Sequence, residues 1–104
     1  MIPEDYFGNR REHKRWPCSW MGKILLADNS FHYIKCLDAS PKGVGIITQS
    51  LLPLNSYVKV EVTTPKVDTF LVEGKVCWCH KVADGFRAGI CFDKALPFSF
   101  ENIL

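Results

Sequence analysis

An alternation of apolar and charged residues at 57–63 constrains the fold of this chain more than any other feature. Three valines occupy every second position, and two charged residues stand between them: Val58, Lys59, Val60, Glu61 and Val62. Because successive side chains of a strand point to opposite faces, this pattern predicts a strand with one buried and one solvated face. The fold must therefore cover one side of a sheet.

Five further stretches have the β-branched and aromatic residues, and the flanking turn residues, that are typical of strands. We expect them at 18–27, 31–37, 44–48, 69–80 and 86–92. No stretch shows a long helical spacing of apolar residues. Six strands joined by turns predict an all-β fold, a six-stranded antiparallel β-barrel. The apolar residues at 95–104 predict a short C-terminal helix or turn that caps one end of the barrel.

The predicted strand at 69–80 carries four large apolar residues on one face: Phe70, Val72, Val76 and Trp78. This shared face predicts core packing for Trp78, with only the edge of its ring close to a surface site. Gly74 lies in the middle of the stretch, and a glycine inside a strand suggests a bulge or a sharp bend. The same alternation places Cys77 and Cys79 together on the opposite face.

The length and composition are those of one globular domain. The chain has 104 residues, of which 47% are hydrophobic and 23% are charged. No apolar run is long enough to span a bilayer, and the acidic N-terminus lacks the pattern of a signal peptide. The five cysteines, an odd number, favour reduced thiols over a disulfide framework and predict a cytoplasmic protein.

A cluster of positive charge lies near the N-terminus. Within six residues four cations face one anion, a local charge of +3 in a chain of net charge +2: Arg10, Arg11, Lys14 and Arg15 against Glu12. Guanidinium groups bind phosphate oxygens, or the O6 and N7 atoms of guanine, through two parallel hydrogen bonds. The cluster predicts a mobile segment that closes over an anion. A solvated basic tail is the alternative.

A second motif follows the second predicted strand: Asp38, Ser40 and Gly43, in the pattern DxSxxG. Asp and Ser side chains hydrogen-bond nearby backbone groups and glycine tolerates positive φ, so the motif predicts a turn. The Asp38 carboxylate accepts hydrogen bonds, and the Ser40 hydroxyl can both donate and accept them. Gly43 leaves room for a ligand at the backbone. Lys42 is a further candidate for phosphate, with a solvated turn lysine as the alternative.

The basic cluster contains the motif RxxxR, formed by Arg11 and Arg15, and DxSxxG follows it along the chain. A third pattern comes after both motifs. It reads Gly74-x-Val76-x-Trp78 and then Gly89-Ile90-x-Phe92. Over nearly its whole length the chain resembles a PilZ domain, the bacterial receptor module for cyclic di-GMP. The resemblance implies an N-terminal arm at 1–17 and a six-stranded barrel domain at 18–104, with the ligand lying across the outside of one barrel end.

The resemblance also implies the site residues and the mode of action. It assigns cyclic di-GMP binding to Arg10, Arg11, Arg15, Asp38, Ser40 and Gly43, with Lys42 and Trp78 as further contacts. An arginine just before RxxxR implies that the ligand is held as a stacked pair of molecules. Closure of the arm would signal to a partner protein that controls motility, pili, exopolysaccharide or chemotaxis, and with them biofilm formation.

Four alternatives compete with this interpretation. One is a PilZ-like adaptor that binds protein and no nucleotide, although such members usually lack motif residues that this chain has. A general oligonucleotide-binding barrel would need a broad basic stripe with exposed aromatic residues. An enzyme would need a nucleophile, a base and an orienting group, which are not recognisable, so we expect neither catalysis nor a cofactor. A metal site at Cys77, Cys79 and His80 would lack a second chelating pair, so we expect no metal.

Overall fold

The computed structural model describes residues 16–66 and 69–94, and the structural statements below refer to them. They form six strands: β1 (Trp16–Leu26), β2 (Phe31–Ser40), β3 (Gly43–Thr48), β4 (Tyr57–Thr63), β5 (Thr69–Val82) and β6 (Gly85–Phe92). The predicted basic arm and the predicted C-terminal helix or turn fall mainly on 1–15 and 95–104, which lie outside the described residues.

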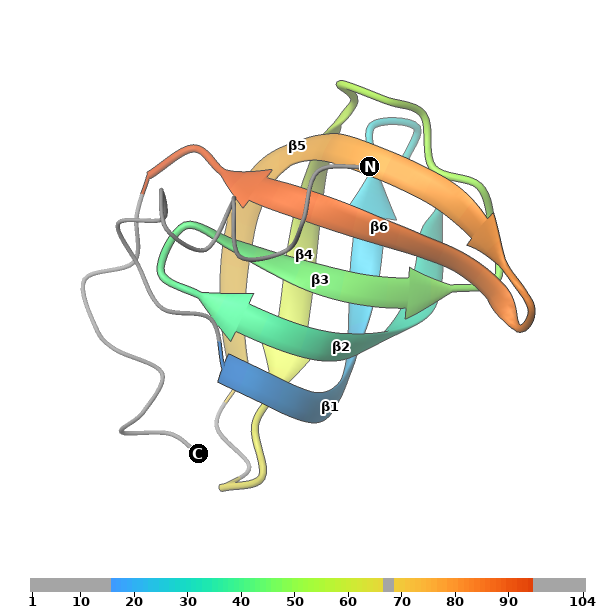
Figure 1. Cartoon of the computed structure of the whole chain (residues 1–104). Coiled ribbons are helices and arrows are strands. Elements are labelled where there is room, and N and C mark those ends of the chain that lie inside the picture. Colours follow the sequence, from blue (N-terminus) through green and yellow to red (C-terminus); the bar gives the residue numbers. More distant parts are fainter. Residues whose placement is uncertain (1–15, 67–68, 95–104) are drawn as a thin grey trace, which may run out of the picture.

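The six strands close into a barrel in the order β1-β2-β3-β6-β5-β4, and every neighbouring pair is antiparallel (Figure 1). β1 pairs with β2 on one side and with β4 on the other, which closes the sheet. Closure removes the unpaired edges that an open sheet would expose. The six-stranded antiparallel barrel predicted from the sequence is confirmed. Within the described part of the chain, no helix is long and apolar enough to cross a membrane.

The core of the barrel is built from inward-facing aliphatic side chains. In β4 the three valines of the alternating stretch are buried, while Lys59 and Glu61 are exposed. Trp20 and Phe70 meet edge to face, with ring centroids 6.3 Å apart. Burial of each large aliphatic side chain contributes about 1.5–3 kcal/mol to folding. The outer wall is therefore free to carry a site without weakening the core.

The predicted core position of Trp78 is wrong. The register of β5 against β6 shifts between Val76 and Trp78, where Cys77 is the extra residue of a β-bulge. One extra residue reverses the alternation, so Trp78 turns outward, 39% exposed, and Cys79 packs against the core. The bulge does not lie at Gly74. There a Cβ would be 2.1 Å from the carbonyl oxygen of Cys91, so glycine permits the close approach of β6.

The predicted turn at 38–43 is shorter than expected. β2 runs on through Ser40, and β1 begins at Trp16, two residues before the predicted start of the barrel domain. The reason is tertiary pairing, because Trp16 and Pro17 lie opposite Ala39 and Asp38 and extend the ladder. A turn of two residues remains between β2 and β3. Sequence patterns do not show such pairing, since the partners lie more than twenty residues apart along the chain.

The expectation of five reduced thiols is wrong for two of them. Cys77 and Cys91 form a disulfide that joins the outer faces of β5 and β6. The bulge in β5 brings Cys77 beside Cys91, with Cα atoms 6.1 Å apart, which is within the range that a disulfide bridges. Cys18, Cys36 and Cys79 are free.

Candidate functional site

The candidate site begins as a row of four residues across the outer wall of the barrel. Cross-strand pairing places Asp38 of β2 opposite Gly45 of β3, Gly45 opposite Gly89 of β6, and Gly89 opposite Trp78 of β5. Residues that pair directly across strands lie about 5 Å apart. The row therefore brings an acid and an indole ring from distant parts of the sequence to one stretch of the wall.

The two glycines in the middle of this row form a floor without side chains, which we call the glycine floor (Gly45 and Gly89). A Cβ atom built on Gly45 would lie 2.9 Å from both carboxylate oxygens of Asp38. One built on Gly89 would lie 2.2 Å from Nε1 of Trp78. The Asp38 carboxylate thus lies over Gly45 and the Trp78 ring over Gly89, at opposite ends of the glycine floor. A strand glycine is typical of a place where another group approaches the backbone closely.

Ser40 and Gly43 shape the turn beside this row. The Ser40 hydroxyl accepts a hydrogen bond from the backbone N–H of Lys42 at 3.2 Å and donates one to the carbonyl oxygen of Gly43 at 3.4 Å. Ser40 is buried, 3% exposed, and Lys42 is exposed. A Cβ on Gly43 would lie 2.5 Å from the backbone oxygen of Ile90. Glycine is required here by close contact with β6, and positive φ, which the sequence suggested, is not the reason.

Two thiols support the backbone under Asp38. The Cys36 thiol donates to the carbonyl oxygen of Asp38 at 3.3 Å, across the irregularity in β2 between these residues. The Cys18 and Cys36 sulfurs lie 3.5 Å apart. The hydrogen bond between these thiols lowers the pKa of Cys18, and the same bond, together with burial, raises the pKa of Cys36. Cys36 therefore stays a neutral donor that holds the backbone carrying Asp38.

An aromatic stack and a cation continue the site along β5 and β6. The rings of Trp78 and His80 stack at 5.1 Å with an angle of 18° between their planes. His80 lies directly opposite Arg87 of β6. Arg87, two residues before Gly89, also lies opposite Ile47 of β3. The bulge makes this arrangement possible, because it turns Trp78 to the same outer face as His80.

The structure brings together part of the predicted site. Asp38, Ser40 and Gly43 gather at the turn between β2 and β3, and Lys42 stands in that turn. Trp78 joins them across the glycine floor. The predicted contacts Arg10, Arg11 and Arg15 lie outside the described residues.

Sequence reasoning missed four participants of this wall: Gly45, Gly89, His80 and Arg87. The glycines could have been recognised as glycines inside predicted strands, which mark a close approach to the backbone. His80 and Arg87 carry no comparable signal, because only the bulge and the β5–β6 register bring them beside Trp78.

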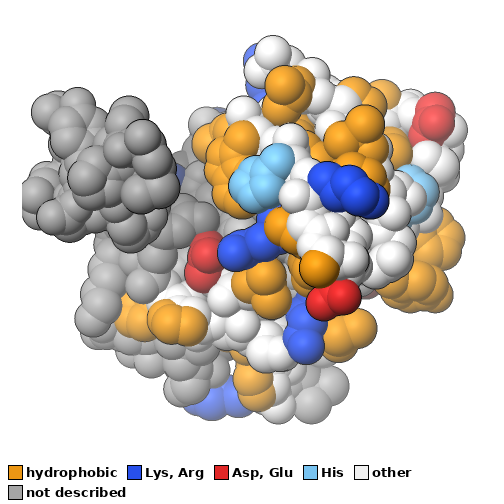
Figure 2. All heavy atoms as spheres, turned by 45° about the vertical axis from the view of Figure 1, so that its right-hand side comes forward, with side chains coloured by type: hydrophobic (Ala, Val, Ile, Leu, Met, Phe, Trp, Pro, Cys, Tyr) orange, Lys and Arg blue, Asp and Glu red, His pale blue; other side chains and the backbone are white. Residues whose placement is uncertain are grey.

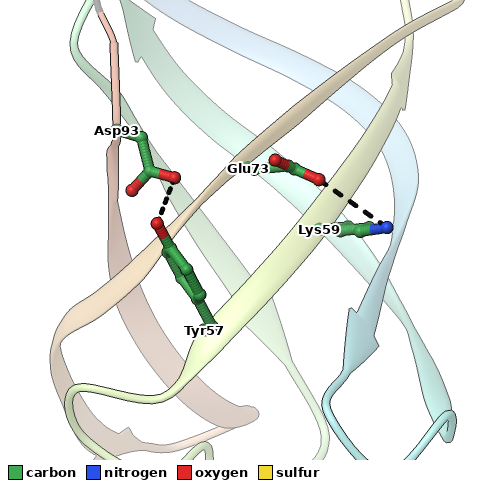
Figure 3. Close-up of polar contacts among 4 residues, drawn as sticks. All are labelled: Tyr57, Lys59, Glu73 and Asp93. Carbon is green, nitrogen blue, oxygen red and sulfur yellow. Dashed lines mark hydrogen bonds and ion pairs between the residues drawn. The ribbon is translucent and has the colours of Figure 1, made fainter.

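A separate pocket of about 280 Å³ lies on another part of the barrel, lined by residues of β1, the following turn, β4 and β5. Three of its polar side chains, those of Tyr57, Lys59 and Glu73, already have partners (Figure 3). Lys59 Nζ lies 3.6 Å from Glu73 Oε1, and the Tyr57 hydroxyl donates to the Asp93 carboxylate. We therefore place the candidate site at the glycine floor.

The charges on the face drawn in Figure 2 are dispersed. Figure 2 shows a face on which separate basic, acidic and histidine side chains lie among hydrophobic ones, without a continuous basic stripe. Among residues 16–66 and 69–94, no group of three His, Cys, Asp or Glu side chains could hold a metal ion. This wall suits a local contact with a small ligand better than a long run of phosphates.

The fold and the site together define a class of protein: a small, closed antiparallel barrel with an acid and an exposed indole over a glycine floor on its outer wall. A family model, that of the PilZ domain, matches residues 9–102. The chain belongs to the PilZ domain family. The resemblance drawn from the motifs is thereby confirmed.

Solved structures have the same fold. The PilZ domain with c-di-GMP of YcgR from Escherichia coli matches with a TM-score of 0.69 and 17% identity, over 90% of this chain and 86% of that one. The Bacillus subtilis inhibitor of motility (MotI/DgrA) matches with a TM-score of 0.73 and 10% identity. That match covers 90% of this chain and 47% of the other. A comparison with curated proteins gives no match.

Proposed function

We propose that the protein is a receptor for cyclic di-GMP, that it has no catalytic activity, and that it acts through a partner protein. The observation that carries the proposal is that Asp38 and Trp78 flank the glycine floor, Asp38 beside Gly45 and Trp78 beside Gly89. A carboxylate there can accept the N1 and N2 hydrogen bonds of guanine, and an exposed indole offers a flat face to a base. Membership of the PilZ family and the likeness to a barrel described with c-di-GMP support it.

The basic segment supplies the remaining contacts of the proposed complex. Arg11 and Arg15 of RxxxR bind phosphate oxygens or guanine O6 and N7, while Arg10 stacks on a purine. Ser40 holds the turn that carries Lys42 near the phosphates. The neighbouring arginine at position 10 favours two stacked ligand molecules for each chain. Closure of the basic segment that precedes β1 against the barrel then changes the surface that a partner in motility, pilus, exopolysaccharide or chemotaxis control recognises.

Calorimetric titration with cyclic di-GMP, with GTP as a negative ligand, tests the proposal. Each charge-assisted contact contributes roughly 1.5–3 kcal/mol. Removing two contacts in the Arg11→Ala/Arg15→Ala variant should therefore weaken binding on the order of a hundredfold or more. The matched control is Lys23→Ala/Lys59→Ala, which removes the same charge from the outer faces of β1 and β4. A stoichiometry of one ligand per chain would contradict the stacked pair.

The alternative is an adaptor of the same family that binds protein and no nucleotide. It makes a different prediction, since the wild type would bind neither cyclic di-GMP nor GTP while still folding as a barrel. That outcome would overturn the receptor proposal.

A further inference from the structure

Arg87 lies on the outer face of β6. It pairs with His80 of β5 on one side and with Ile47 of β3 on the other. His80 in turn stacks on Trp78, whose ring lies over Gly89. We call Trp78, His80 and Arg87 the Arg87 cluster. It lies next to the glycine floor on the side away from Asp38.

The guanidinium of Arg87 has an unused donor. Its Nε atom is buried and has no hydrogen-bond partner in the structure. An arginine remains charged at every physiological pH, and a buried donor left without a partner is unfavourable. Native proteins rarely leave such a donor unpaired, so a bound group or an ordered water is expected beside the Arg87 guanidinium. By contrast, Lys59 of β4 pairs with Glu73 of β5.

The other members of the cluster offer a stacking surface. Trp78 is 39% exposed and His80 is exposed, and their rings are nearly parallel. A nucleobase can continue such a stack, and stacking on an aromatic side chain is tolerant of base identity. Arg87 can supply selectivity for one base, because its planar guanidinium matches two acceptors that lie side by side on one edge of that base.

We propose that the Arg87 cluster is a guanine subsite. The base stacks on the His80–Trp78 pair, and the Arg87 guanidinium donates to its O6 and N7 atoms. Guanine presents both acceptors on that edge, whereas adenine presents an amino donor in place of O6. The inference rests on the proposed function, in which Asp38 holds guanine on the other side of the glycine floor. It adds a second source of discrimination between bases, on β5 and β6, to that of the RxxxR and DxSxxG motifs.

Titrations of the full chain with cyclic di-GMP and with its 7-deaza analogue, which lacks only the N7 acceptor, test the subsite. Arg87→Lys keeps the charge and removes the fork, so it should weaken cyclic di-GMP binding about tenfold or more. The wild type should prefer cyclic di-GMP over the 7-deaza analogue, and this preference should shrink in Arg87→Lys. His80→Ala, an exposed substitution, should weaken binding of both ligands by at least about fivefold.

Thermal unfolding of each variant confirms that it folds. Wild-type affinity and an unchanged preference for N7 in Arg87→Lys would overturn the subsite and leave the receptor proposal standing. Normal binding by His80→Ala would overturn the stacking half of the proposal. Failure of the wild type to bind cyclic di-GMP would overturn the proposed function itself.

Discussion

At the scale of single residues, the candidate site depends on glycines, which have no side chain to cover the backbone. Gly43 and Gly45 both stand in β3, yet a Cβ at each would meet a different kind of atom. At Gly43 it would meet the backbone oxygen of Ile90, which cannot move without moving β6. At Gly45 it would meet the carboxylate of Asp38, which can rotate away. The two glycines therefore have separable roles, one in the fold and one in the site.

Substitution of Gly45 by alanine should weaken cyclic di-GMP binding about tenfold, because the new methyl group displaces the Asp38 carboxylate from the glycine floor. Its thermal stability should change little. The Gly43→Ala variant should lose about 1–3 kcal/mol of unfolding free energy through overpacking against backbone. Calorimetry and denaturant unfolding of both variants separate the effects. Equal binding by Gly45→Ala and wild type would contradict the role of the floor.

Tyr57 gives a prediction for alkaline pH. Its hydroxyl donates to the Asp93 carboxylate, and this bond raises the pKa of Tyr57 above its ordinary value of 10.0. The protonated phenol is thus favoured in the folded state. Its contribution to stability is complete below the unfolded pKa and is lost as the pH rises through the higher folded pKa. Ultraviolet titration of tyrosinate in wild type and Tyr57→Phe should show the late-titrating group only in the wild type. An unchanged titration curve would contradict the contact.

At the scale of elements, β5 determines which groups reach the outer wall. Its bulge at Cys77 turns Trp78 and His80 outward and brings Cys77 beside Cys91. A β-bulge reverses the alternation of all residues beyond it, so one inserted residue converts a predicted core tryptophan into a surface group. The disulfide lies next to the row that holds Trp78 and Gly89, and it links the two strands of the Arg87 cluster.

The link between β5 and β6 should stabilise the barrel measurably. It spans 14 residues of sequence, and closing a loop of this size contributes about 3 kcal/mol in the chain-entropy model. The Cys77→Ser/Cys91→Ser variant should lose stability by up to this amount in urea unfolding, while reducing agent should not destabilise it further. Thiol titration of the unfolded wild type should find three free cysteines, Cys18, Cys36 and Cys79. Five free thiols without reductant would contradict the link.

At the scale of the whole molecule, the closed barrel separates stability from function. Inward side chains hold the sheet together, whereas the outer wall of β2, β3, β5 and β6 carries the candidate site (Figure 1). A barrel without open edges also resists strand slippage, which keeps paired residues such as Gly45 and Gly89 in register.

This separation predicts unequal effects of two truncations. Ile46 is fully buried, so Ile46→Ala should cost about 2–5 kcal/mol of unfolding free energy. Leu71 is 61% exposed on the outer face of β5, and Leu71→Ala should change stability by less than about 0.5 kcal/mol. Denaturant midpoints measure both. Similar losses in the two variants would mean that the core does not lie inside the barrel.

Local patterns were sufficient for the six strands, for the buried face of β4 and for the family, because each depends on residues close together in sequence. Strand alternation has a period of two residues, and a motif such as DxSxxG needs only six positions. Asp38, Ser40 and Gly43 were likewise identified before their surroundings were known.

Pairing between strands decided the rest. The outward position of Trp78, the Cys77–Cys91 link and the meeting of Arg87 with His80 all follow from the β5–β6 register and its bulge. The glycine floor follows from the register of β3 against β2 and β6. Register is a property of two strands at once, set by closure of the barrel around its core, so no single stretch of the chain contains it.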